Sequence, residues 1–294
     1  MNARAETLER AVRGRSLWRD ALVRLRANRA AIASLAVLGV IVAACVAGPW
    51  FSPHDHFTQD YGAIWVEPGL TDAHWFGTDS LGRDLFVRAL EGGRMSLLIG
   101  LVATLVSLVI GVVYGATAGY LGGRVDGVMM RIVDILYAMP FLFFVILLMV
   151  FFGRNILLIF VAIGAINWLD MARIVRGQTL ALKGQPFIEA ARMAGAPAPA
   201  IIARHIVPNL LGVVVVYITL TIPQVILFES FLSFLGLGVA EPATSWGALI
   251  KDGADEMGRA PWLLVVPAVL LAATLFCFNF IGDGLRDALD PKDR

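Results

Sequence analysis

Six long apolar stretches dominate the chain. A helix needs about 20 predominantly apolar residues to cross the roughly 30 Å hydrocarbon core of a bilayer. The stretches have apolar residues on every side, whereas a surface helix of a soluble protein carries a polar face. The pattern predicts an all-α polytopic membrane protein with six transmembrane helices. We place them at residues 31–51, 96–119, 132–152, 156–169, 208–228 and 262–282.

Composition supports this interpretation. The 294 residues are 58% hydrophobic and 16% charged, with a mean hydropathy of +0.76, which excludes an ordinary soluble domain. The fourth stretch is short, but its helix can continue through Asp170 and Arg173 into water.

The distribution of charge predicts how the chain crosses the membrane. Residues 1–30 contain eight Arg, and residues 171–205 contain five basic residues and a single acid. Lys and Arg collect in short cytoplasmic loops. We therefore expect both termini on the cytoplasmic side of the membrane. The expected segments are a cytoplasmic amphipathic segment 1–30, an extracytoplasmic loop 52–95, a core 96–282 containing the cytoplasmic loop 171–207 and the outer loop 229–261, and a cytoplasmic tail 283–294.

The N-terminal segment lacks the apolar core of a secretory signal peptide. A helix there places apolar residues on one face, and either lies on the anionic inner leaflet or only sets topology through its charge. The apolar residues are Leu17, Trp18, Ala21, Leu22 and Leu25. Cys45 and Cys277 fall at different depths of the first and sixth spans, so we expect no disulfide.

Residues 187–208, "FIEAARMAGAPAPAIIARHIVP", interrupt the apolar pattern. Pro186 suits the first turn of a helix, and Gly195 suits the position just past its end. This predicts a helix over 187–195, followed by a second helix that begins at Pro199 and runs into the fifth span, with Pro208 at its boundary. Small and apolar side chains on the first helix offer a surface for a partner protein.

Three motifs resemble one family. Glu189-Ala190-Ala191, Gly195 and Pro208 resemble the coupling loop of ABC-importer permease subunits, and "RHIVPN" (204–209) resembles the version found in the peptide and nickel branch. "HWFGTDSLGRDLFVRALEGGRMSL" (74–97) and "FESFLSFLGLGVAEPATSWG" (228–247) are similar to the C-type permease of dipeptide, oligopeptide and nickel importers. With "ANRAA" before the first span, the resemblance covers nearly the whole chain.

The resemblance implies a type I ABC-importer permease fold in a bacterial plasma (inner) membrane, with residues 96–282 as the permease core and a cytoplasmic coupling helix. It implies a non-catalytic subunit that binds no cofactor, and no phosphate-binding Gly-x-x-x-x-Gly-Lys-Ser/Thr motif occurs in the chain. ATP and Mg would then be bound by partner subunits. The implied partners are a B-type permease in a heterodimer, two ABC ATPase subunits, an extracytoplasmic substrate-binding protein and membrane lipid, with no nucleic acid. The implied coupling residues are Phe187, Glu189, Ala190, Ala191, Met193, Gly195, His205 and Pro208.

The outer segments contain a second group of candidate residues. Asp79 can cap backbone amides and Gly82 can adopt a positive φ, so "GTDSLGRD" predicts a tight turn. The resemblance implies a rigid outer platform or gate that receives the substrate-binding protein. Its residues are Gly77, Asp79, Gly82, Arg83, Asp84, Ser233, Gly236, Trp246 and Gly247.

Polar residues in or beside the spans have two interpretations each. We expect Asp134 to pair locally with Arg131, and Asp170 to pair with Arg173 or a partner chain. Glu229 is expected at the outer end of the fifth span, where solvent or a partner satisfies it. Candidate pathway residues, which alternatively bridge helices, are Asn167, Gln224 and Asn279.

His54, His56 and His74 in the first outer loop have the side chains of a transition-metal site. Exposed loop histidines are common, however, and we expect no metal site. Peptides are the favoured substrate class, and nickel or another small solute is the alternative. A secondary transporter is disfavoured because we find no inverted repeat, and an intramembrane protease because the chain lacks its motifs.

Overall fold

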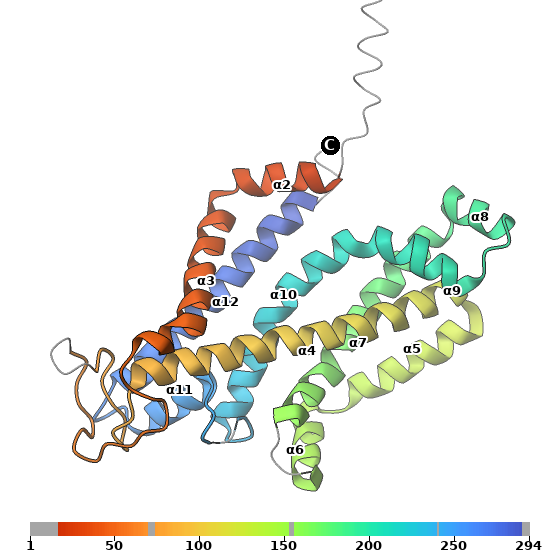
Figure 1. Ribbon diagram of the computed structural model, residues 1–294. Coiled ribbons are helices and arrows are strands. Elements are labelled where there is room, and N and C mark those ends of the chain that lie inside the picture. The colour runs from red at the N-terminus through yellow and green to blue at the C-terminus, as the bar shows by residue number, and fades with distance from the viewer. Residues whose placement is uncertain (1–16, 70–73, 153–155, 240, 290–294) are drawn as a thin grey trace, which may run out of the picture.

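The computed structural model describes residues 17–69, 74–152, 156–239 and 241–289. Within these ranges the chain is helical, and its only β-type pairing is an isolated bridge between Thr78 and Asp84. Figure 1 shows the helices side by side, with loops at one end and α8 at the other. The helices are α2 (Leu17–Ala27), α3 (Arg29–Ala47), α4 (Leu85–Leu121), α5 (Gly123–Ala138), α6 (Phe141–Phe152), α7 (Ile156–Lys183), α8 (Pro186–Met193), α9 (Ala198–Ile201), α10 (Val207–Phe234), α11 (Trp246–Asp255) and α12 (Trp262–Leu289). A 3-10 turn, Gly48–Phe51, follows α3, and a π-helical turn, Ile202–Ile206, joins α9 to α10.

In the described ranges, four helical segments are long and apolar enough to cross a membrane. They are Arg29–Phe51, Leu85–Leu121, Ala198–Phe234 and Trp262–Leu289, and they contain four of the six predicted spans. A fifth arises if α5 and α6 together form one bent span. The predicted span 156–169 lies in α7, where most side chains before Ile163 are outside the described set.

The predicted span 132–152 is not a single straight helix. The chain bends by 85° between α5 and α6, and the break falls at Met139 and Pro140. Proline lacks a backbone N–H and disfavours helical geometry in the residue before it. Met139 accordingly has φ −75° and ψ 129°, which is extended backbone. The apolar run continues through the break, so hydropathy alone did not reveal it.

Helix α4 begins earlier than the apolar pattern predicts. Asp84 caps its N-terminus, since Oδ1 accepts a hydrogen bond of 2.9 Å from the Val87 N–H. The helix therefore starts at Leu85 rather than at residue 96 and contains 37 residues. At about 1.5 Å per residue it is roughly 55 Å long, well beyond the hydrocarbon core. It thus connects the loop end of the molecule to the α8 end (Figure 1).

Glycines on one face of α4 allow α7 to approach closely. A Cβ placed at Gly115 would lie 2.3 Å from the Ala172 carbonyl oxygen, and one at Gly111 would lie 2.5 Å from the Met171 Cβ. Gly119 continues the same row four residues on, against Thr179. Small residues at this spacing let membrane helices pack backbone against backbone.

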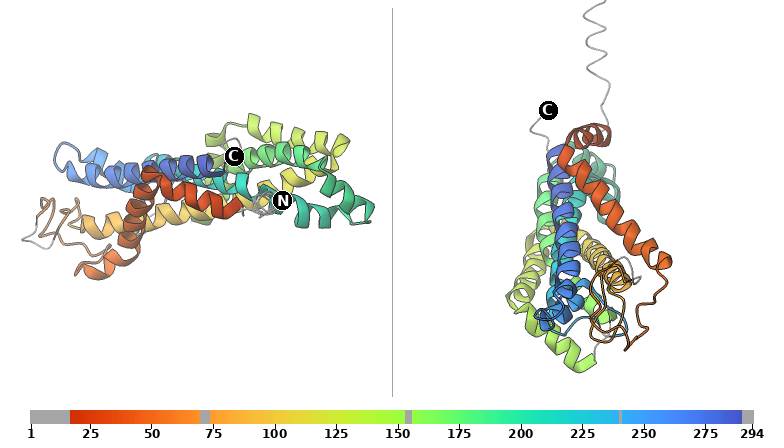
Figure 2. Two further views of the ribbon diagram at one scale, coloured as in Figure 1. Left: turned by 90° about the horizontal axis from the view of Figure 1, so that it is seen from above. Right: turned by 90° about the vertical axis from the view of Figure 1, so that its left-hand side faces the viewer.

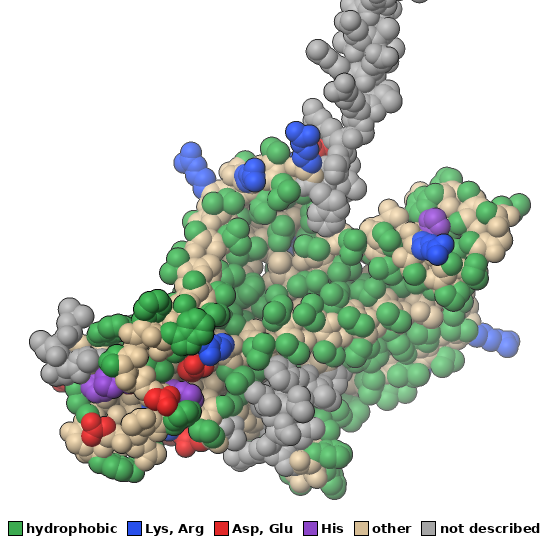
Figure 3. Space-filling model, viewed as in Figure 1, with side chains coloured by type: hydrophobic (Ala, Val, Ile, Leu, Met, Phe, Trp, Pro, Cys, Tyr) green, Lys and Arg blue, Asp and Glu red, His purple; other side chains and the backbone are tan. Residues whose placement is uncertain are grey.

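The N- and C-terminal helices pack together. Figure 1 shows α3 beside α12, Figure 2 shows that α3 diverges from α12 toward the loop end, and a Cβ placed at Gly284 of α12 would lie 2.6 Å from the Ala31 Cβ and 3.3 Å from the Leu25 side chain. Cys45 and Cys277 are both buried free thiols, as predicted. Figure 3 shows that hydrophobic side chains cover the middle of the molecule, that acidic side chains gather at the loop end, and that Lys and Arg lie mainly over α2 and near α8.

Two ion pairs join α5 to α7 and correct the expected pairing. Arg173 binds Asp134 at 2.8 Å, and Arg176 binds both Asp126 oxygens at 2.5 and 2.6 Å. Asp134 therefore pairs across helices rather than with Arg131, and Arg173 pairs with Asp134 rather than with Asp170. The side-by-side packing of α5 and α7 brings together residues about 40–50 positions apart, which sequence spacing alone did not suggest.

Candidate functional site

The candidate residues gather at two ends of the molecule. We call residues 52–84, 235–245 and α11 the loop platform, and residues 186–208 the α8 segment. In Figure 1 the loop platform lies at one end of α4 and the α8 segment lies near the other end.

Asp79 organises the turn predicted from "GTDSLGRD". Its Oδ1 accepts hydrogen bonds of 2.9 Å from the backbone N–H groups of Leu81 and Arg83. Its Oδ2 accepts a 2.7 Å bond from Arg83 Nε and also contacts the Arg88 guanidinium. Asp79 is 6% exposed, so these bonds are needed to offset the cost of burying the carboxylate.

Two arginines extend this network to a distant part of the chain. Arg83 donates to Glu241 Oε1 at 2.9 Å, and Arg88 lies 3.7 Å from an Asp252 carboxylate oxygen of α11. Burial lowers the pKa of the Arg83 guanidinium, but the hydrogen bond to Glu241 and the charge of Asp79 raise it above its ordinary value. A pocket of about 220 Å³ lies among these side chains. Arg88 sits inside the motif 74–97 but was not among the predicted platform residues.

Glycines let separate segments of the platform touch. Gly82 has φ +71°, and a Cβ added there would overlap the Asp60 carbonyl. Gly77 has φ +79°, and a Cβ added there would lie 2.5 Å from the Val66 carbonyl oxygen. Gly236 ends α10 with φ +74°. A Cβ at Gly247 would lie 2.4 Å from the Ser230 backbone, so only glycine fits between α11 and α10.

Glu229 is fully buried, which corrects the expectation that solvent satisfies it. Ser96 of α4 donates to Glu229 Oε2 at 2.9 Å, and Ser233 donates to Oε1 at 2.6 Å. Ser245 then donates to Ser233 at 3.1 Å, and the Trp246 N–H donates to Ser96 at 3.2 Å. This network joins α4, α10 and the start of α11. Sequence analysis missed the role of Ser96 and Ser245, although Glu229 and Ser233 share a helical face four residues apart.

Trp246 fixes α11 to the outer half of α4. The side chain is fully buried, and its Nε1 donates to the Ala89 carbonyl at 2.9 Å. A Cβ at Gly93 would lie 2.6 Å from the Trp246 ring, so a small residue on α4 is needed to accommodate the indole.

The α8 segment is anchored on one side and open on the other. Helix α8 covers Pro186–Met193, close to the predicted 187–195, and Gly195 follows it with φ +78°. Ile188 is fully buried among residues of α4, α7 and α10. Phe187 and Met193 are 40% and 89% exposed.

Most other residues of the α8 segment are partly or fully exposed, whereas Ile201 and Ile206 are buried. Glu189 and Ala190 are exposed, and Ala191 is half-buried. His205 is half-buried in the π-helical turn and its carbonyl accepts a 2.6 Å bond from the Asn209 amide; Pro208 is exposed in the first turn of α10. The exposed surface therefore combines apolar side chains with the Glu189 carboxylate and the guanidinium groups of Arg192 and Arg204.

The three candidate pathway residues lie on three different helices. Asn167 of α7 is buried and donates to the Ile163 carbonyl of its own helix at 2.9 Å. Gln224 and Asn279 are exposed on α10 and α12.

One long helix, α4, connects the charged loop platform to α8, a short helix with exposed apolar side chains.

Residues 107–294 match the model of the binding-protein-dependent transport system inner membrane component family. The chain belongs to this family. Residues 16–68 also match the N-terminal transmembrane domain of oligopeptide transport permease C. The resemblance drawn from the sequence motifs is therefore confirmed.

Curated relatives resemble the chain over nearly its full length. The oligopeptide transport system permease protein OppC of Escherichia coli (strain K12) is 59% identical over 290 residues, covering 99% of this chain and 95% of the relative. OppC of Haemophilus influenzae is 56% identical over 286 residues, covering 97% and 92%. The dipeptide transport system permease protein DppC of Bacillus subtilis is 44% identical over 280 residues, covering 95% and 87%.

Proposed function

We propose that the chain is a transmembrane permease subunit of an ATP-driven ABC importer for oligopeptides. The observation that carries this proposal is the 59% identity to OppC of Escherichia coli across 99% of the chain. The membership in the inner membrane component family supports the same conclusion. The chain itself would hydrolyse nothing, and ATP with Mg²⁺ would be bound by partner ATPase subunits.

We further propose six membrane crossings with both termini in the cytoplasm, as in a type I ABC-importer permease. The four apolar segments would be joined by the α5–α6 pair and by the first half of α7. This topology places the Arg-rich residues 1–30 and 171–205 inside, in agreement with the positive-inside rule. The loop platform would then face the extracytoplasmic side, and the α8 segment would face the cytoplasm.

The α8 segment would be the coupling helix that docks on an ATPase. Its support is the combination of a buried anchor, Ile188, with the exposed side chains of Phe187, Glu189 and Met193. Burying the anchor makes α8 move with α4, α7 and α10, whereas the exposed face is available to a partner. When two ATPases close on ATP, α8 would be displaced and α4 would transmit this motion to the loop platform. Such rigid-body motion of packed helices is a known form of domain closure.

The loop platform would receive the substrate-binding protein. The network of Asp79, Arg83, Arg88 and Glu241 holds segments more than 150 residues apart in sequence, so the platform has a defined shape before any partner arrives. A B-type permease would cover the exposed polar side chains of Gln224 and Asn279, which would complete a pathway between the two permeases. A second ATPase would dock on that partner.

Transport by a reconstituted complex tests this function. Proteoliposomes containing the chain, a B-type permease and the ATPases, with binding protein outside and ATP inside, should accumulate a labelled oligopeptide. The uptake should stop without ATP, without the binding protein, or with a non-hydrolysable nucleotide. Accumulation of labelled Ni²⁺ but not peptide would overturn the substrate assignment. Peptide uptake driven by an ion gradient without ATP would overturn the assignment to an ABC importer.

A further inference from the structure

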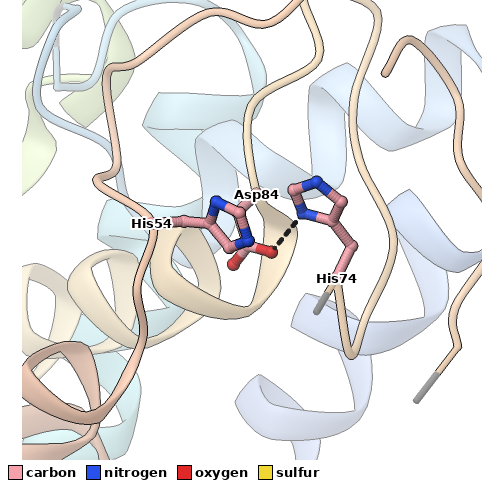
Figure 4. A group of neighbouring side chains, drawn as sticks. All are labelled: His54, His74 and Asp84. Atoms are coloured by element: carbon pink, nitrogen blue, oxygen red, sulfur yellow. Dashed lines mark hydrogen bonds and ion pairs between the residues drawn. The ribbon is translucent and has the colours of Figure 1, made fainter. Parts of the chain in front are cut away.

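Three side chains of the loop platform converge on one point. They are His54, which follows the 3-10 turn after α3, His74, which precedes the Asp79 turn, and Asp84, which caps α4 (Figure 4). One donor atom of each residue lies within 4.8 Å of the others. Figure 4 shows the two imidazole rings directed toward the Asp84 carboxylate from two separate loop segments.

Asp84 has a divided role in this cluster. Its Oδ1 accepts the capping hydrogen bond from the Val87 N–H, and its Oδ2 lies 2.9 Å from His74 Nδ1. Asp84 is 2% exposed and His74 is 8% exposed, so the charge of the carboxylate is shielded from water. Arg83 of the platform and Arg88 of α4 are directed at Asp79 and Glu241 instead.

A hydrogen bond between His74 and Asp84 accounts for only two of the three side chains. The His54 ring stacks on the His74 ring, with centroids 4.2 Å apart and planes inclined by 21°. The His54 Nε2 atom is buried and has no hydrogen-bond partner. Buried polar atoms in folded proteins are almost always bonded to protein, to ordered water or to an ion. The orphaned nitrogen therefore indicates that the cluster has a further ligand.

We propose that His54, His74 and Asp84 bind a divalent transition-metal ion of the Zn²⁺ type. Two imidazole nitrogens and one carboxylate oxygen are a ligand set that suits Zn²⁺, with bond lengths of about 2.0–2.2 Å. The three donor atoms lie within 4.8 Å of one another, so the two rings would turn out of their stacked arrangement to place all three on a single ion, and a water molecule would complete a four-coordinate site. The ion replaces the missing partner of His54 Nε2 and neutralises the buried carboxylate of Asp84.

The ion has a structural role in this arrangement. It ties the chain that leaves α3 to the loop around residue 74 and to Asp84. The last two are already joined by the Thr78–Asp84 bridge and by the hydrogen bond from the Leu85 N–H to the Gly77 carbonyl, so the ion mainly fixes the segment around His54. His56 does not belong to the site, because its Nδ1 pairs with Asp55 at 2.9 Å and its ring packs on Phe57. Two of the three histidines noted in the sequence, His54 and His74, are therefore ligands. The third ligand is Asp84, the capping residue of α4, which the sequence analysis assigned only to the platform.

Metal binding to the purified full-length chain in detergent tests the proposal. The protein would be stripped with a chelator and dialysed against ZnCl₂, and bound zinc would be measured by mass spectrometry. We expect one ion per wild-type chain, and at least tenfold weaker binding in His54→Ala and in His74→Ala. His56→Ala is the matched control and should bind zinc as the wild type does. Asp84→Asn retains a good capping residue but removes the charge, so it should fold normally and also bind at least tenfold more weakly.

A second measurement does not depend on variants. Diethyl pyrocarbonate modifies accessible imidazoles, and zinc should protect the partly exposed His54 but not His56 or His205 of the same wild-type chain. Stoichiometric zinc that is lost in the His54 and His74 variants, together with this protection pattern, supports the site. Zinc binding no stronger than in the His54→Ala, His74→Ala double variant, or binding that the His56 change removes equally, overturns it and assigns the space beside His54 to water.

Discussion

Arg192 of α8 donates from its Nε to the Tyr120 hydroxyl, 3.2 Å away, and so joins α8 to the last turn of α4. The guanidinium also lies over the Tyr120 ring, 5.0 Å from its centroid. Asp84 caps the opposite end of the same helix, within the loop platform. A single 37-residue helix therefore has a polar attachment at each end. This arrangement supplies a physical path between the proposed ATPase and receptor surfaces.

Arg192→Ala should reduce coupling between the two ends. The change removes a hydrogen bond that contributes about 0.5–1.5 kcal/mol and a cation–π contact of about 0.5–1 kcal/mol. We expect fewer peptides imported per ATP hydrolysed, at an unchanged amount of chain in the membrane. Tyr120→Phe keeps the ring and should have a smaller effect. The ratio of peptide uptake to phosphate release in proteoliposomes measures both. Wild-type ratios in both variants would show that this contact does not contribute to coupling.

Gly115→Leu should destabilise the α4–α7 packing. A Cβ at Gly115 would lie 2.3 Å from the Ala172 carbonyl oxygen, which belongs to a backbone that cannot easily move away. Overpacking of this kind costs about 1–3 kcal/mol. Gly127→Leu is the control, because a Cβ there meets nothing within 4 Å and leucine favours a helix. Unfolding of the purified chain in a denaturing detergent should shift for Gly115→Leu alone. Equal midpoints would show that α4 and α7 do not pack as described.

Glu229→Ala should loosen the junction of α4, α10 and α11. The change leaves the hydroxyls of Ser96 and Ser233 without their acceptor inside the protein, at a cost of about 1–3 kcal/mol. Glu229→Gln retains an acceptor oxygen and a similar volume, so it should cost less than the Ala change. Thermal unfolding of the detergent-solubilised chain compares the two. A Gln variant as unstable as the Ala variant would show that charge, rather than the hydrogen-bond network, stabilises this junction.

The length of the continuous apolar runs predicted the long helices, because a helix that crosses lipid must be apolar over about 20 residues. It did not predict the break at Pro140, since Leu, Phe and Met flank it on both sides. Nor did it predict the start of α4, which depends on the Asp84 cap rather than on hydropathy. Proline and glycine positions did predict α8 and the positive φ of Gly195, because both depend on local backbone sterics.

Contacts between distant segments were the least predictable part of the candidate site. Ser96 donates a hydrogen bond to Glu229, which is 133 positions away in the sequence, and Arg83 donates one to Glu241, which is 158 positions away. Which serine or carboxylate lies opposite depends on the rotation of packed helices, and one sequence does not determine that rotation. The convergence of His54, His74 and Asp84 depends likewise on how distant segments fold together, which one sequence does not determine.

Cysteine labelling should reveal opposite sides for the two candidate surfaces. Tyr61 in the loop platform is 68% exposed and Met193 in α8 is 89% exposed, so a cysteine at either position is reachable by a reagent. In a background in which Cys45 and Cys277 are replaced by Ala, a membrane-impermeant maleimide should label Tyr61→Cys in spheroplasts. It should label Met193→Cys only after the membrane is permeabilised. Labelling of Met193→Cys in intact spheroplasts would overturn the proposed topology.

Photo-crosslinking from α8 tests the proposed coupling most directly. A benzoylphenylalanine would be placed at Met193, whose side chain points away from the core, in the active complex with its ATPases. Tyr61 in the loop platform would carry the same group as a control. The account predicts a covalent adduct between this chain and an ATPase from position 193, with a yield that changes between nucleotide-free and ATP-bound states, and no ATPase adduct from position 61. An active complex that gives no ATPase adduct from position 193, or one that gives it from position 61, would contradict the assignment of α8 as the coupling helix.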